Sequence, residues 1–193
     1  MTGYGRIDDP YCRAGSSVLL NRRSLTAAAE LEEFEVAMVA LRFKQPLPSG
    51  KFDPAHYRAI HHHLFQDVYD WAGQYRSVRI AKGQSMFCYP EHIAGQMDAL
   101  FARLRGAAFG DGADRVMFVA AAADFLSELN AIHPFREGNG RTQLTFLFLL
   151  GERAGHPLDM TRIRPELLMA AMIVSFGGEL AALEREIGGL VGS

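Results

Sequence analysis

Apolar residues recur at steps of three and four positions along most of this chain, which is the spacing that gives an α-helix one apolar face. The chain has 193 residues, of which 49% are hydrophobic, so it can bury one substantial core. We therefore expect a single, mainly α domain over residues 1–193, built as a bundle of about seven helices. The helices are predicted at 24–44, 53–72, 91–105, 113–130, 142–152, 161–175 and 179–187.

Some of these helices carry recognisable end signals. Asp53 followed by Pro54 is typical of a helix start, because Asp accepts from the first unpaired amides and Pro is tolerated at the first helical position. Thr161 is expected to cap the sixth helix, and Gly73 is expected to end the second. These signals define the expected boundaries.

Strand-like patterning is confined to one region. Residues 77–82 and 84–89 read as two short extended segments around a turn at Gly83, which predicts a small β-hairpin over 77–90. Residues 1–23 are rich in Gly, Asp, Pro and Arg and are expected to form an irregular N-terminal segment.

Charge and cysteine content argue against several classes of function. The formal net charge is −2, so no basic surface is expected for nucleic acid, and we predict no nucleic-acid partner. Cys12 and Cys88 lie far apart and away from any metal-ligand spacing, which favours neither a disulfide scaffold nor a zinc site. Because the N-terminus lacks a signal-peptide pattern and no apolar run could span a membrane, a cytoplasmic protein without a membrane partner is expected.

Residues 133–141 read His-Pro-Phe-Arg-Glu-Gly-Asn-Gly-Arg and lie between two apolar helices. Pro134 cannot continue a helix, so the chain must form a loop here. Gly138 and Gly140 permit unusual backbone angles on either side of Asn139, where the next helix should begin. Unpaired amides at a helix start favour an anion, and the segment therefore predicts a phosphate-binding nest.

Three side chains of this segment suit phosphate chemistry. Arg141 adds a fixed positive charge with forked donors. Glu137 offers a carboxylate, and Mg²⁺ prefers one or two protein oxygens together with phosphates and water. His133 brings an imidazole, which can take the proton of an attacking hydroxyl. A base, a metal ligand and a phosphate site thus fall within one short segment.

The segment resembles the signature of the Fic family, His-Pro-Phe-x-(Asp/Glu)-Gly-Asn-Gly-Arg-x-x-Arg, at every position but the last. The resemblance covers most of the chain and implies the Fic fold, a helical bundle with a β-hairpin flap. It also implies transfer of AMP from ATP to a hydroxyl group of a target protein, with release of pyrophosphate. The other matching stretches are Ile60-His61 and 64–73 before the hairpin, Lys82-Gly83 and Phe87-Cys88 in the flap, and 9–11, Val18, Leu19 and Asn21 near the N-terminus.

The resemblance also implies a role for each matching residue. His133 would be the general base for a Ser, Thr or Tyr hydroxyl, Glu137 would hold Mg²⁺ on the nucleotide, and Phe135 would anchor the loop in the core. The residues implied to bind the nucleotide are Gly138, Asn139, Gly140 and Arg141. Those implied to dock an extended target segment through backbone hydrogen bonds are Lys82, Gly83, Gln84, Ser85, Met86 and Phe87.

Leu144 stands where the signature has its second Arg. In the family that Arg binds the γ-phosphate and pairs with an inhibitory glutamate. Leu144 therefore leaves alternatives open: transfer of another nucleotide, a phosphoryl group or phosphocholine, or a catalytically weak protein that binds nucleotide. Retention of His133 and Glu137 favours a working enzyme, because a binding protein needs no base.

The family's inhibitory motif is Ser/Thr-x-x-x-Glu followed by Gly or Asn. The two partial matches, Thr26 to Glu30 and Ser175 to Glu179, are each followed by Leu, and helix surfaces often carry this spacing by chance. The chain thus resembles the toxin half of Fic toxin–antitoxin pairs. A small antitoxin carrying the inhibitory helix is a hypothetical partner.

Two further features receive structural interpretations. Arg136 occupies a variable position of the signature and is expected at the surface. The run His61-His62-His63 is not expected to bind a metal, because consecutive helical residues point about 100° apart. His61 is expected to be a buried structural residue.

Overall fold

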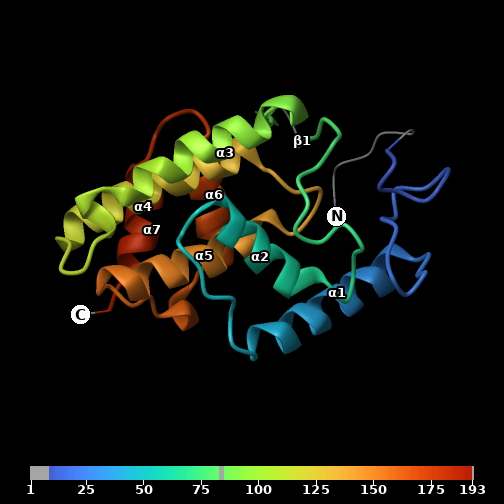
Figure 1. The fold of residues 1–193 in the computed structure, drawn as a ribbon, viewed down its shortest axis with the longest axis horizontal. Coiled ribbons are helices and arrows are strands. Elements are labelled where there is room, and N and C mark those ends of the chain that lie inside the picture. Colours follow the sequence, from blue (N-terminus) through green and yellow to red (C-terminus); the bar gives the residue numbers. More distant parts are fainter. Residues whose placement is uncertain (1–8, 83–84, 193) are drawn as a thin grey trace. The chain divides into compact units, whose positions relative to one another are not determined.

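The computed structural model describes residues 9–82 and 85–192, and within them the chain is mainly helical (Figure 1). The predicted fold class is confirmed: these residues form seven α-helices and one two-stranded antiparallel sheet, with four short 3-10 turns. The helices are α1 (Ala28–Phe43), α2 (Pro54–Phe65), α3 (Ile93–Ala102), α4 (Arg115–Ile132), α5 (Asn139–Ala154), α6 (Pro165–Ser175) and α7 (Ala181–Leu190). No helix among the described residues is long and apolar enough to cross a membrane.

The chain divides into two compact units. The first comprises the described residues up to Ile93 together with Pro134–Thr142, and the second comprises Ala94–His133 and the described residues from Gln143 onward. A single domain over residues 1–193 stays a prediction.

In the first unit, α1 packs against α2. Helix α2 begins as predicted, since Asp53 accepts from the backbone N–H of His56 at 2.8 Å and Pro54 is the first helical residue. It ends at Phe65, so the predicted end at Gly73 is wrong. Beyond Phe65 the chain forms turns that keep Val68 buried, which is why the apolar pattern outlasts the helix.

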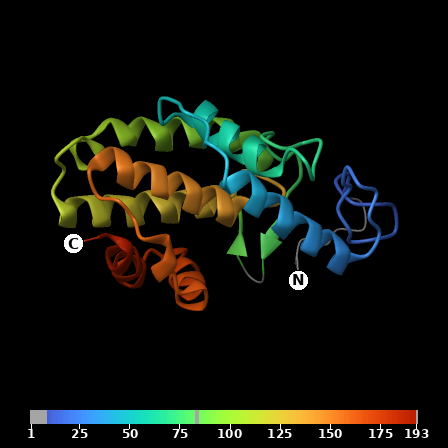
Figure 2. The same ribbon diagram turned by 90° about the horizontal axis from the view of Figure 1, so that it is seen from below.

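The hairpin of the first unit is shorter than predicted. Strands β1 (Ala81–Lys82) and β2 (Ser85–Met86) pair antiparallel, and Figure 2 draws them as two short arrows. The flanking segments are not strands, because the carbonyls of Val78 and Cys88 accept from the Arg76 side chain, at 2.6 and 2.5 Å, instead of pairing across the hairpin.

In the second unit, α6 and α7 pack against each other and against α4. Rings from three helices form part of its core: the centroid of Phe101 lies 5.2 Å from that of Phe125 and 5.3 Å from that of Phe146. Thr161 does not cap a helix as predicted. It lies in a 3-10 turn capped by Asp159, and α6 begins later, at Pro165.

Candidate active site

His133 ends helix α4 in the second unit. Its backbone N–H donates to the carbonyl of Leu129 at 3.0 Å, and its φ of 48° lies in the left-handed region. Pro134 follows and disfavours right-handed helix for the residue before it, so the helix must stop here. Residues other than glycine adopt this conformation at a cost, and such strain gathers at functional positions.

One contact of the His133 ring favours one tautomer. Its Nδ1 lies 3.3 Å from the carbonyl oxygen of Asn130. Because a carbonyl can only accept, this contact favours a proton on Nδ1, which makes Nε2 the basic nitrogen of the neutral form. This is the form in which Nε2 can act as a base.

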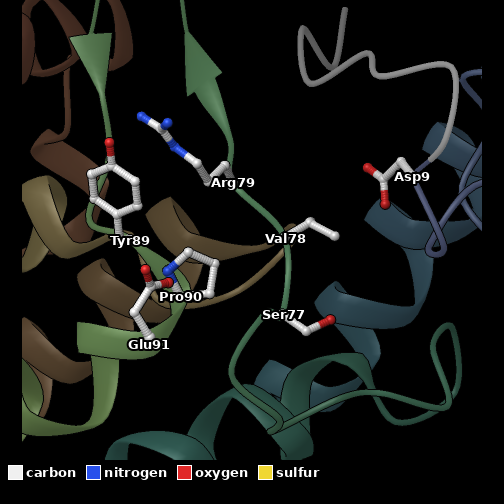
Figure 3. A pocket seen from close by; sticks show the side chains of 7 residues that line it. All are labelled: Asp9, Ser77, Val78, Arg79, Tyr89, Pro90 and Glu91. Atoms are coloured by element: carbon white, nitrogen blue, oxygen red, sulfur yellow. The ribbon is translucent and has the colours of Figure 1, made fainter.

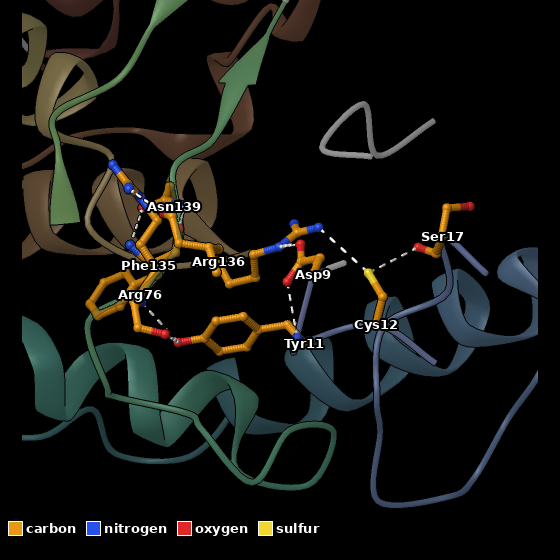
Figure 4. Close-up of polar contacts among 10 residues, drawn as sticks. Asp9, Tyr11, Cys12, Ser17, Arg76, Phe135, Arg136 and Asn139 are labelled. Atoms are coloured by element: carbon orange, nitrogen blue, oxygen red, sulfur yellow. Dashed lines mark hydrogen bonds and ion pairs between the residues drawn. The ribbon is translucent and has the colours of Figure 1, made fainter. Parts of the chain in front are cut away.

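The loop of residues 134–138 belongs to the first unit and is closed by hydrogen bonds. The backbone N–H of Arg76 donates to the carbonyl of Pro134 at 2.9 Å. The Asn139 side chain bonds Phe135 twice, accepting from its N–H at 2.9 Å and donating to its carbonyl at 2.8 Å (Figure 4). The Asn139 side chain thus fixes the shape of the loop, and its contact with a nucleotide stays a prediction.

Arg136 is buried, so the prediction that it lies at the surface is wrong. Its Nε donates to Asp9 Oδ2 at 2.7 Å and its Nη2 to Cys12 Sγ at 3.8 Å (Figure 4). The other oxygen of Asp9 accepts from the N–H of Tyr11 at 2.9 Å. Because a buried charge must be paired to be tolerated, this ion pair ties the N-terminal segment to the loop.

His61 supports the loop from helix α2, and its predicted burial is confirmed. Its ring stacks on that of Phe135, itself fully buried, with centroids 3.7 Å apart. The N–H of Gly73 donates to Nδ1 at 2.8 Å, so Nε2 carries the proton and donates to the Glu137 carbonyl at 3.0 Å. Burial lowers the pKa of His61 from 6.5 to about 3, which keeps the ring neutral.

Gly138 makes the turn into helix α5, with a φ of 80°. A Cβ at this position would stand 2.4 Å from Cζ of the buried Phe65, so only glycine fits. Gly140 differs from the expectation, because it lies inside α5 without a positive φ. Apart from its chain neighbours and the backbone of its own helix, no described residue comes within 4 Å of where its Cβ would stand. The unpaired amides of this first helical turn remain the candidate anion site.

The Glu137 carboxylate lies beside this helix start. Its side chain is 16% exposed, and its Oε1 accepts from the N–H of Gly138 at 2.9 Å. Its Oε2 is buried and has no hydrogen-bond partner among the described residues. Burial, followed by the negative charge of Glu35, raises the pKa of this carboxyl group. A buried carboxylate oxygen without a partner fits a ligand of Mg²⁺.

Arg141 lies in the first turn of α5. Its Nη2 donates to Oε1 of Glu35 in helix α1, and its Cζ lies 4.8 Å from the centre of the Phe65 ring. The same Nη2 is 3.9 Å from Oε1 of Glu137. Leu144, at the position of the missing signature Arg, follows one turn later along α5.

Comparison with known proteins identifies the family of the chain. A model of the Fic/DOC family matches residues 51–150. The chain belongs to the Fic/DOC family. Among its relatives, Probable protein adenylyltransferase y4lH of Sinorhizobium fredii is 48% identical over 97% of this chain and 98% of that protein. Probable protein adenylyltransferase Fic of Escherichia coli K12 is 34% identical over 94% of this chain and 91% of its own length.

Solved Fic structures have the same fold. The N-terminal Fic domain of a VirB-translocated effector from Bartonella quintana, crystallised with bound ADP, matches with a TM-score of 0.86 and 28% identity, covering 94% of each chain. BepC from Bartonella tribocorum, with bound AMPPNP, matches with a TM-score of 0.85 over 94% of this chain and 96% of that one. BepC is 24% identical and is compared for its fold alone.

The Fic hairpin is fastened at its base. Arg76 is buried and donates to the carbonyls of Val78 and Cys88 on either side of the hairpin. The side chain of Phe87 is buried as well and anchors the hairpin, whereas Met86 is 53% exposed. Backbone docking at either residue stays a prediction. Of the other predicted docking residues, Lys82 and Ser85 pair in the hairpin, and Gly83 and Gln84 lie outside the described residues.

A pocket of about 390 Å³ lies at the base of the hairpin (Figure 3). One wall carries the guanidinium of Arg79, whose Cζ stands 3.9 Å from the centre of the Tyr89 ring. The pocket was not expected from the sequence, because its walls come from segments far apart in the chain. It is lined by Asp9, Ser77, Val78, Arg79, Tyr89, Pro90 and Glu91.

Two residues that support the Fic site were missed by the sequence analysis. Glu35 falls four residues after Leu31 on the buried face of α1, so a carboxylate on an apolar stripe was the available signal. Arg76 carried no such signal, since its carbonyl partners converge only in the folded chain.

Proposed function

We propose that this chain is a protein adenylyltransferase that transfers AMP from ATP to a hydroxyl side chain of a target protein and releases pyrophosphate. The observation that carries the proposal is the buried, unpartnered oxygen of Glu137 at the start of α5, in a segment that begins with His133. The names of the y4lH and Fic relatives support the same activity.

The nucleotide phosphates would be bound at the first turn of α5. The amide at Gly140 would hold the α-phosphate region, and Arg141 would bind the outer phosphates. The Gly138 amide donates to Glu137 Oε1 in this structure, so its contact with phosphate stays a prediction. The site fits Mg²⁺, with Glu137 as its protein ligand, and the bound ion would supply charge neutralisation on the phosphates. Glu137 must be ionised for this role, although burial raises its pKa.

His133 would act as the general base. Its Nε2 takes the proton of the target hydroxyl as the hydroxyl oxygen forms a bond to the α-phosphorus. The bond between the α-phosphorus and the bridging oxygen breaks, and pyrophosphate leaves with the electron pair. Because the protein makes no covalent intermediate in this scheme, its contribution is positioning and charge stabilisation.

The target would pair with the hairpin as an added strand. A two-stranded sheet has open edges, and main-chain hydrogen bonds to such an edge would hold an extended target segment beside the loop. The side chain of Met86, which is 53% exposed, would lie against the target.

Isotope position tests the reaction. Purified protein added to a cell extract with Mg²⁺ should add a labelled protein over the extract alone when ATP is labelled at the α-phosphate, and should add none when ATP is labelled at the γ-phosphate. His133→Ala should abolish the labelling, whereas His62→Ala, at an exposed histidine of α2, should retain it. Labelling from the γ-phosphate alone would refute AMP transfer.

Leu144 favours one second candidate, transfer of a different group from the same site. Without a second arginine one turn after Arg141, a donor with fewer or differently placed phosphates could be used, such as another nucleotide, a phosphoryl donor or a phosphocholine donor. The mass added to the modified target distinguishes these groups.

A small antitoxin that inserts an inhibitory helix is a further proposed partner. Glu30 and Glu179, the glutamates of the two partial inhibitory motifs, are both exposed. Co-expression of this chain with a small protein that carries the inhibitory motif tests inhibition by a separate chain. The cytoplasmic location stays a prediction.

A further inference from the structure

Glu35 is a buried carboxylate in helix α1, remote in sequence from the Fic loop. Its side chain is 9% exposed, and both of its oxygens accept hydrogen bonds. Oε2 accepts from the hydroxyl of Tyr69 at 2.5 Å, and Oε1 accepts from Nη2 of Arg141. Charge-assisted bonds of this kind are stronger than neutral ones and fix geometry.

Tyr69 holds Glu35 in place from the other side. Its ring is 2% exposed and stacks on that of Trp71, with centroids 4.3 Å apart and planes 17° apart. Burial raises the pKa of Tyr69, so the hydroxyl keeps its proton and remains a donor to Glu35. The carboxylate is therefore fixed without any contribution from a nucleotide.

Arg141 is held on two sides but is not enclosed. Its guanidinium is bonded to Glu35 and lies against the Phe65 ring, 4.8 Å from Cζ to the ring centre, while the side chain stays 34% exposed. A guanidinium has five N–H donors, so a bond to Glu35 through Nη2 leaves it able to bind phosphate as well. Arginine rotamers are otherwise costly to immobilise when a ligand binds.

We propose that Glu35 is a positioning residue, which holds the Arg141 guanidinium at the start of α5 so that it meets the outer phosphates of the nucleotide. The proposal rests on the proposed function, because it assumes that Arg141 binds those phosphates. Glu35 acts through Arg141 and does not touch the substrate. Glu35 should therefore affect the affinity only for nucleotides with outer phosphates. It should not affect the affinity for AMP, which has a single phosphate.

Calorimetric titration with Mg²⁺ and α,β-methylene-ATP, which cannot release pyrophosphate, tests this directly, with AMP as the comparison ligand. Glu35→Ala should raise the Kd for the triphosphate analogue about tenfold, an effect of about 1.4 kcal/mol, and leave the Kd for AMP unchanged. Glu35→Gln keeps an acceptor for Arg141 and should stay within about threefold of the wild type. Glu33→Ala removes an exposed carboxylate from the same helix and is the matched control.

A double-mutant cycle separates positioning from a general structural role. In an Arg141→Ala background, Glu35→Ala should have no further effect on the Kd for the analogue. Tyr69→Phe, which removes the hydroxyl that fixes Glu35, can replace Glu35→Ala in the cycle if that variant does not fold, with a smaller effect in the same direction.

The outcomes distinguish the two proposals. If the wild type binds the analogue no more tightly than AMP, Arg141 has no role at the outer phosphates, and both the phosphate assignment and the positioning role are wrong. If the wild type prefers the analogue and Glu35→Ala leaves that preference unchanged or increases it, only the role of Glu35 is overturned. An increase would mean that Glu35 competes with the phosphates for Arg141.

Discussion

The Fic loop and the hairpin both belong to the first unit, but they are fastened in different ways. Along the loop, from Pro134 to Gly138, each residue has a backbone or side-chain hydrogen bond to its surroundings. The hairpin has strands of two residues each, is fixed at its base by Arg76, and exposes Met86. The comparison indicates that the loop, which we propose binds the nucleotide, is fixed by the fold, whereas the hairpin, which we propose docks the target, has open strand edges.

The largest effect on stability is expected from a substitution in the loop itself. Gly138→Ala should lower the free energy of unfolding by about 3 kcal/mol, because the new methyl group would clash with Phe65 and the positive φ would be strained. Chemical denaturation measures the loss. Gly140→Ala is the matched control, with open space at its Cβ, and should change stability by less than about 0.5 kcal/mol. Equal losses at both glycines would contradict the account of the loop.

Removing the fastening of the hairpin should have the next largest effect. Arg76→Lys cannot reach both the Val78 and Cys88 carbonyls, so stability should fall by about 2 kcal/mol through buried acceptors left unpaired. Target labelling should fall further than AMP binding, since the loop contact of Arg76 uses its backbone. Arg105→Lys, at an exposed arginine of the second unit, is the control and should be near neutral. If Arg76→Lys lowered nucleotide affinity as much as target labelling, the loop and the hairpin would not act as separate regions.

The pH dependence of stability tests the contact by which His61 supports the loop. The ring is neutral in the folded protein, where its pKa is about 3, but gains a proton below 6.5 when the chain unfolds, so stability is full above pH 6.5 and falls as the pH drops toward 3. Between pH 6.5 and 3, the free energy of unfolding should fall more steeply with decreasing pH in the wild type than in His61→Gln. The two slopes should differ by up to about 1.4 kcal/mol per pH unit. Denaturation at several pH values measures it. His62→Gln, at the exposed neighbour, should keep the slope of the wild type, and a shared change would exclude His61 as the cause.

The smallest effect is expected on the outward face of the hairpin. Met86→Ala should leave stability within about 0.5 kcal/mol and leave the Kd for α,β-methylene-ATP unchanged, because the side chain is exposed. Target labelling should fall severalfold if the target lies against this edge. Met117→Ala, at an exposed methionine of α4, is the control. A change in the Kd for α,β-methylene-ATP would show that Met86 contributes to nucleotide binding, which would contradict its assignment to the target.

The parts of this fold that follow from local rules were predictable from the sequence. Helical periodicity predicted the helices, and Asp53-Pro54 marked the start of α2 because capping depends only on neighbouring residues. The end of α2 was missed because the turns after Phe65 keep the same residues buried. The glycines of the motif likewise placed the start of a helix at Asn139, where α5 begins.

Contacts between distant segments were not predictable in the same way. Arg136 was expected at the surface, yet it is buried against Asp9, more than a hundred residues earlier in the chain. Glu35 and Arg76 owe their roles to partners that only folding brings near. A single sequence carries no record of such pairs, since a buried arginine and an exposed one have the same local pattern.

The central claim is that the loop beginning at His133 transfers AMP. Tandem mass spectrometry of a target modified in the presence of unlabelled ATP and Mg²⁺ tests it most directly. We predict an adenosine monophosphate group on a Ser, Thr or Tyr hydroxyl, absent when His133→Ala replaces the wild type. A target that carries a phosphoryl group, another nucleotide or phosphocholine in place of AMP, or the same adduct formed by His133→Ala, would contradict the account.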